Sequence, residues 1–276
     1  MFRGVRTGYN AVTPMPNNAT TPASIMPLGH AARPDDLAGP IYIETDFGRW
    51  LVEPWNAASA ALFLLVTGYW LWRLRGRYRE HAFLTACLPF IAIGGIGGTV
   101  YHAFRGHPVW LFMDWMPIAI LCIATAVYLW ARLLRRWWYS LLIIPGLFGF
   151  WTLLFGVLGG TGRRDLAIGI NYSVLAAVIG LPALGVLWKT GWRNAHLPAL
   201  AVLFFALAVT SRQLDSLAVS TDRTWMTRWL PMGTHFLWHV FGAGAAHCVA
   251  AFLFRLPPAR ARESRSPAIA FDRPDG

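Results

Sequence analysis

Long apolar runs dominate the chain between residues 54 and 255 and limit what it can fold into. Each run holds about 20 residues or more, the length that an α-helix needs to cross the ~30 Å hydrocarbon layer of a membrane. Their approximate limits are 54–73, 82–104, 109–132, 138–160, 166–188, 196–216 and 233–255. Outer-membrane strands would instead show alternation over ~10 residues. The sequence therefore predicts an all-α integral membrane protein, a bundle of seven transmembrane helices.

The composition fits a membrane protein better than a soluble one. Hydrophobic residues make up 56% of the chain and charged residues only 13%, whereas about a quarter of a soluble domain is charged. The net charge of +11 comes from arginines placed between the apolar runs. Such charge is typical of cytoplasmic loops and contacts with anionic headgroups, so we expect no nucleic-acid partner.

The chain divides into three parts, and its loop charges predict an orientation. Residues 1–37 and 257–276 are interpreted as a mobile N-terminal arm and a mobile C-terminal tail, and residues 38–256 as the membrane domain. The loops that share a side with the C-tail hold Arg73, Arg75, Arg77, Arg79, Arg132, Arg135, Arg136, Lys189 and Arg193. The opposite loops hold Arg105, Arg163, Arg164, Arg223 and Arg228. The positive-inside rule then places the C-terminus in the cytoplasm and the N-terminus outside.

Seven polar residues stand at the ends of apolar runs, where membrane helices usually carry none. They are Glu53, Asn56, His102, Asp114, Asp215, His235 and His239. Because successive spans alternate in direction, all seven are expected near the N-terminal face. Ionisable residues at membrane depth are by default candidates for a functional site. In a bacterial inner membrane, this site would lie toward the periplasm.

Three of these residues are candidate metal ligands. His235 and His239 are four residues apart, so both rings project from one face of a helix. With His102 as a third ligand, the fourth position of a tetrahedral zinc site would stay open, as in catalytic zinc sites. The alternative is a pair of histidines that form interhelical hydrogen bonds without metal. His247 lies deeper in the last run and is interpreted as a packed residue.

Four stretches carry a family resemblance: "VEPWNAASAALFLL", "GGIGGTVYHAF", "LFMDWMP" and "THFLWHVFGAGAAH". In this order, between about residues 41 and 256, they resemble the alkaline ceramidase family. That family belongs to a superfamily of seven-helix zinc hydrolases that includes adiponectin-receptor-like proteins. The resemblance implies that His102, His235 and His239 hold zinc and that Asp114 assists proton transfer. It also implies hydrolysis of a ceramide, or of a related N-acyl lipid, to a fatty acid and a free amine.

The chain differs from the family pattern at Gly98, and its match to the family's calcium site is open to two interpretations. The family has a serine one turn before the first zinc histidine, where this chain has Gly98; the hydroxyl of Thr99 is a partial substitute. The family's calcium site corresponds here to Glu44, Asp46 and Glu53, which offer the hard oxygen ligands that Ca²⁺ prefers. The alternative for this stretch is a solvated interfacial turn.

Three functions therefore remain open from the sequence. The first is a zinc-dependent hydrolase of a lipid amide. The second is a catalytically weak or inactive relative, a zinc-containing lipid-binding or receptor-like protein in which Gly98 has abolished turnover. The third is a transporter, although nothing in the sequence suggests the paired inverted repeats of many transporters.

Overall fold

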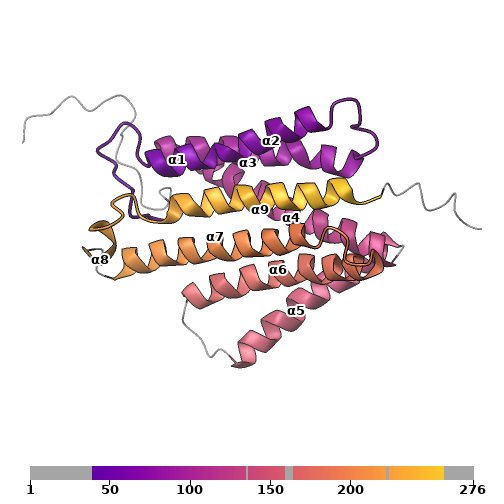
Figure 1. Ribbon diagram of the computed structural model, residues 1–276. Helices are drawn as coiled ribbons and strands as arrows, with labels where there is room; N and C mark the ends of the chain where they lie inside the picture. Colours follow the sequence, from indigo (N-terminus) through magenta and orange to yellow (C-terminus); the bar gives the residue numbers. More distant parts are fainter. Residues whose placement is uncertain (1–38, 135, 159–163, 222–223, 258–276) are drawn as a thin grey trace, which may run out of the picture. The chain divides into compact units, whose positions relative to one another are not determined.

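The computed structural model describes residues 39–257, except for residues 135, 159–163 and 222–223 (Figure 1). All regular secondary structure in this part of the chain is helical, which confirms the all-α prediction. The predicted arm and, apart from residue 257, the predicted tail lie outside the described residues.

Each predicted apolar run is helical where the structure describes it. The helices are α1 Pro54–Ala60, α2 Leu62–Arg73, α3 Ala82–Phe104, α4 Pro108–Leu134, α5 Ser140–Leu158, α6 Arg164–Lys189, α7 His196–Ser220, the short α8 Thr224–Thr227 and α9 His235–Arg255, with a 3₁₀ turn at Trp137–Tyr139. Among the residues that the structure describes, four helices, α3, α4, α7 and α9, are long and apolar enough to cross a membrane. These helices identify a membrane protein; the crossing of all seven runs stays a prediction.

The first apolar run is divided into two helices that continue one another. Pro54 stands in the first turn of α1, where its missing N–H removes no helical hydrogen bond. Ala61, between α1 and α2, keeps right-handed helical angles of φ −62° and ψ −16°. The chain thus changes little in direction between Pro54 and Arg73, and Glu53 comes immediately before the first turn.

Helix α9 runs antiparallel to α7 and also contacts α1 and α2 (Figure 1). Near its first residues, the Thr234 hydroxyl donates to the Ser211 carbonyl in α7 (2.7 Å). At its other end, Arg255 donates to the side chain of Asn194, just before α7 begins (3.1 Å). This pairing brings the start of α9 beside the end of α7, where Asp215 lies.

Glycines on α3 allow two neighbouring helices to approach it closely. A Cβ atom added at Gly95 would lie 3.0–3.1 Å from Leu64 and Phe63 in α2, and one at Gly98 would lie 3.2 Å from Ala60 in α1. A Cβ atom at Gly97 would contact Met113 in α4, including its carbonyl carbon at 2.6 Å. Small residues permit such approaches between membrane helices. They place α1 and α4 on either side of the end of α3 that carries His102.

Large apolar side chains point away from the packed helices. Leu65 is 69% exposed, Val202 62% and Trp188 76%. Extended apolar surface of this kind is rare on soluble proteins and marks contact with a membrane or a partner. The exposed side chains agree with the membrane assignment made from helix length and hydropathy.

We expect Gly97→Ala to destabilise the protein, because the new methyl group would meet the backbone of α4 at Met113 and Asp114. Overpacking of this kind typically costs about 1–3 kcal/mol. Thermal unfolding in detergent measures the effect, with Gly68→Ala as the control, since a Cβ at Gly68 meets nothing within 4 Å. Equal unfolding temperatures for both variants would show that α3 and α4 are not in close contact.

Candidate metal centre

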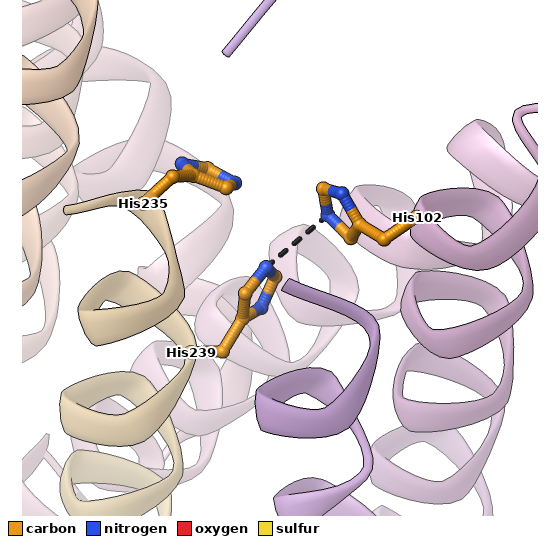
Figure 2. A group of neighbouring side chains, drawn as sticks. All are labelled: His102, His235 and His239. Atoms are coloured by element: carbon orange, nitrogen blue, oxygen red, sulfur yellow. Dashed lines mark hydrogen bonds between the residues drawn. The ribbon is translucent and has the colours of Figure 1, made fainter. Parts of the chain in front are cut away.

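Three buried histidines converge from two helices (Figure 2). His102 lies in the last turn of α3, and His235 and His239 lie in the first two turns of α9. The three side chains are at most 1% exposed, and each offers a ring nitrogen within 4.8 Å of the others. The structure therefore brings together the three residues that the sequence predicted as ligands, and this group could bind a metal ion.

The spacing of the ring nitrogens suits a metal ion. The Nε2 atoms of His102 and His239 are 3.2 Å apart and form a hydrogen bond (Figure 2). In a tetrahedral zinc site with Zn–N distances of 2.0–2.1 Å, two ligand nitrogens lie about 3.3–3.4 Å apart. The buried Nδ1 atom of His235 has no hydrogen-bond partner among the described residues. A small rearrangement could thus bring the rings around one ion.

Glu53 fixes the orientation of His102. Its Oε2 atom lies 2.5 Å from Nδ1 of His102, and its Oε1 atom accepts from Nη1 of Arg105 (2.6 Å). Thr45 and Asn56 also donate to the Glu53 carboxylate. With Nδ1 of His102 held against Glu53, its other ring nitrogen, Nε2, points toward His239. Carboxylates of this kind commonly orient metal-binding histidines.

The Glu53 carboxylate is fully buried, and its neighbours set its pKa. Burial raises the pKa of this group, but the hydrogen bond and charge of His102, together with the charge of Arg105, outweigh burial and hold the pKa below its ordinary value. A buried charge is tolerated only where it is paired and hydrogen-bonded. Arg105 supplies the opposite charge at this position.

Asp215 connects α7 to the start of α9 and to the segment before α1. Its Oδ1 atom accepts from the backbone N–H groups of Thr234 (2.8 Å) and His235 (3.2 Å). Its Oδ2 atom accepts from the N–H of Ile43 (3.2 Å). The side chain is fully buried. Asp215 therefore contacts the backbone of His235, one of the three histidines.

The pre-helical segment, residues 39–53, lies against the histidines. The ring of Tyr42 stacks on His235, with centroids 3.7 Å apart and planes at 18°, and lies 5.6 Å from His102. The N–H groups of Val52 and Glu53 donate to carbonyls in the last turn of α3, at 2.9 and 3.1 Å. This segment covers the three-histidine site.

Asp114 comes close to α3 at Gly98. A Cβ atom added at Gly98 would lie 2.5 Å from Oδ1 of Asp114, so this carboxylate lies one turn from His102. The hydroxyl of Thr99 donates to the carbonyl of Gly95 (2.7 Å) and is engaged within its own helix. Of the two residues, Asp114 therefore shows the closer relation to the site.

The expected calcium ligands have separate partners. Glu44 accepts from the N–H groups of Trp55 and Asn56 at the start of α1. Asp46 is exposed and pairs with Arg49 (2.9 Å), while Glu53 faces His102 and Arg105. The structure does not bring these three carboxylates together: in the described part of the chain, the grouped metal ligands are the three histidines. Calcium binding stays a prediction.

His247 lies apart from this group. Its ring packs near Tyr69 and Trp70 in α2, at centroid distances of 5.2 and 5.6 Å. Eight residues separate it from His239, which places it about two turns farther along α9. The packed position agrees with the role expected from the sequence.

Two residues beside the site, Arg105 and Tyr42, were not predicted as part of it. Arg105 was assigned to a loop, yet it is 1% exposed and pairs with Glu53. Arg105 follows His102 by three residues, directly after α3 ends at Phe104, and this proximity in the sequence is the one available signal. Tyr42 precedes the first helix by many residues, and no periodic pattern predicts its stacking on His235.

Comparison with models of known protein families and with curated proteins found no match. The family resemblance of the four sequence stretches therefore remains a hypothesis.

We expect Glu53→Gln to weaken metal binding by about 10- to 100-fold, the usual effect of altering a carboxylate that orients a histidine ligand. The amide keeps the shape but loses the charge that faces His102 and Arg105. Competition with a zinc chelator measures the affinity. Asp46→Asn is the matched control, because that carboxylate is exposed and pairs only with neighbours in its own turn. Equal affinities for both variants would contradict the orienting role.

Proposed function

We propose that this protein is a zinc-dependent intramembrane hydrolase of lipid amides, similar to the alkaline ceramidases. Its substrate would be ceramide or a related N-acyl lipid, cleaved to a fatty acid and a free amine. One observation carries the proposal: three buried histidines from α3 and α9 converge, and a buried carboxylate orients one of them. The resemblance of the four sequence stretches supplies the reaction and the substrate class.

The donor set favours zinc over harder cations. In the described part of the chain the grouped ligand atoms are three imidazole nitrogens. Such a set suits zinc and leaves one tetrahedral position open for chemistry. A zinc ion held there would supply a Lewis acid for amide hydrolysis. The free cysteines Cys87, Cys122 and Cys248 do not join the group of ligands in the structure.

The chain's own residues would divide the remaining tasks. Asp114 lies against Gly98 and one turn from His102, and it would accept a proton and return it to the leaving amine. Glu53 holds the ring of His102 in one orientation. Gly98 leaves room for the Asp114 carboxylate, since a side chain at residue 98 would force that group to move.

Gly98 also favours the second function, a receptor-like protein with a metal but without turnover. The family serine would donate to the oxyanion, and the hydroxyl of Thr99 is already bonded to Gly95. Losing one such donor typically lowers a rate by about 10²- to 10³-fold. Turnover of N-acyl lipids by the wild-type protein distinguishes the two functions.

We further propose that all seven apolar runs cross the membrane, with the histidine site toward the outer, periplasmic face. Arg105 is buried against Glu53 instead of exposed in a loop, so it does not count among the loop charges on the side of the N-terminus. The excess of basic residues on the side of the C-tail is therefore larger than the sequence count suggested. This supports a cytoplasmic C-terminus.

The main experiment is Asp114→Asn, assayed with fluorescent ceramide and other N-acyl lipids. If Asp114 transfers the proton, the variant keeps its zinc and loses roughly 10²-fold or more in turnover. If Asp114 only orients a ligand, zinc affinity falls together with the rate. Unchanged turnover in a zinc-loaded variant would contradict the assignment, and a wild-type protein that binds zinc but cleaves no N-acyl lipid would support the receptor-like function.

Topology can be tested with terminal reporters. An enzyme that is active only in the cytoplasm should give signal when fused to the C-terminus and none when fused to the N-terminus, because basic residues keep their loops inside. Signal from the N-terminal fusion alone would reverse the orientation, and signal from both would contradict an odd number of spans.

A further inference from the structure

We propose that Asp215 is a positioning residue whose two carboxylate oxygens have separate roles. Oδ1 holds the start of α9, and with it His235, while Oδ2 fastens the pre-helical segment over the three histidines. The predicted effect of Asp215 on metal exchange rests on the proposed zinc site, but both structural roles can be measured in the metal-free protein.

The Oδ1 atom replaces a missing helix cap. The first N–H groups of a helix have no partner within it. The side chain of Thr234, at the N-cap of α9, accepts none of them; its hydroxyl donates to the carbonyl of Ser211 (2.7 Å). Asp215 accepts instead from the N–H groups of Thr234 and His235. A carboxylate at this end also interacts favourably with the helix dipole.

The turn before α9 leaves just enough room for this carboxylate. Gly233 adopts a φ of +68°, and a Cβ atom there would collide with Oδ1 of Asp215 and lie 2.7 Å from Cβ of Ile43. Both the backbone angle and the contact favour glycine. The close approach means that Asp215, Ile43 and the start of α9 are held in one small volume.

The Oδ2 atom fastens one end of the pre-helical segment. It accepts from the N–H of Ile43, whose side chain packs with Ala218 in α7 and Met226. The preceding residue, Tyr42, is thereby held over the ring of His235. The other end of the segment is bonded to α3 through Val52 and Glu53. The segment is thus attached on both sides of the histidines.

This arrangement has a consequence for metal exchange. The three histidines are at most 1% exposed, so an ion could enter or leave only when the covering residues open. Breaking the bond between Ile43 and Oδ2 would free the end of the segment that carries Tyr42. Asp215 should therefore influence both how well His235 is placed and how fast metal exchanges.

Asparagine separates the two roles. In Asp215→Asn, the amide oxygen can keep the hydrogen bonds from the N–H groups of Thr234 and His235. The NH₂ group then faces the N–H of Ile43, and because both groups are donors, that hydrogen bond is lost. Asp215→Ala removes all three bonds. Ser211→Ala is the matched control: Ser211 is also buried in α7, and its hydroxyl donates to the Leu207 carbonyl of its own helix (2.8 Å).

The first measurement is amide hydrogen exchange on the full-length, metal-free proteins in detergent. In Asp215→Asn, exchange should accelerate by about tenfold or more at Ile43, the usual scale for a lost bond to a charged acceptor, and stay near wild type at Thr234 and His235. In Asp215→Ala it should accelerate at all three. Ser211→Ala should match wild type at these amides.

The second measurement is zinc loss to a chelator. Asp215→Asn should keep the wild-type zinc content but release zinc about tenfold faster or more, whereas Asp215→Ala should bind zinc more weakly. Wild-type exchange at Ile43 in Asp215→Asn would overturn the proposal, even if Asp215→Ala does not fold. Wild-type release from Asp215→Asn would overturn the role in metal exchange. A wild-type protein that binds no zinc would refute the proposed function while the exchange data still decide the role of Asp215.

Discussion

The contact between Glu53 and Nδ1 of His102 is the interaction on which the rest of the site depends. It joins the start of α1 to the end of α3, and it directs the other nitrogen of His102 toward α9. The same carboxylate neutralises Arg105, a fully enclosed cation. Removing one member of a buried ion pair usually costs about 3–5 kcal/mol, because the partner is left uncompensated. Orientation of a ligand and stability of this end of the molecule are therefore coupled through one side chain.

A second carboxylate plays a comparable part on the opposite side of the histidines. Glu53 acts on α3 through a side chain, whereas Asp215 acts on α9 through backbone amides. The pre-helical segment is bonded near both, at Val52 and Glu53 on one side and at Ile43 on the other. Membrane helices can slide and tilt against each other with little hydrophobic resistance, so polar contacts of this kind define their register. They place three imidazoles from two helices at one depth.

Much of this arrangement could be predicted from the sequence, because membrane helices follow from apolar length alone. The positions of His102, His235 and His239 at helix ends, with the i, i+4 spacing of the last two, were sufficient to predict their convergence. The roles of the acidic residues were harder to predict. Glu53 was considered as an oxygen ligand for calcium, but a carboxylate can as well orient a histidine, and only the positions of His102 and Arg105 distinguish the two. Tyr42 and Arg105 depend on tertiary contacts that no periodic pattern records.

The central claim is that His102, His235 and His239 together hold one metal ion. Its most direct test is zinc content per chain in purified wild-type protein, beside single alanine variants of the three residues and His247→Ala as the control. The wild type and His247→Ala should hold about one zinc per chain, and each of the three ligand variants should lose most of it, since tetrahedral zinc sites generally need at least three protein ligands. Zinc that remains at the wild-type level after both His235 and His239 are replaced would contradict the account.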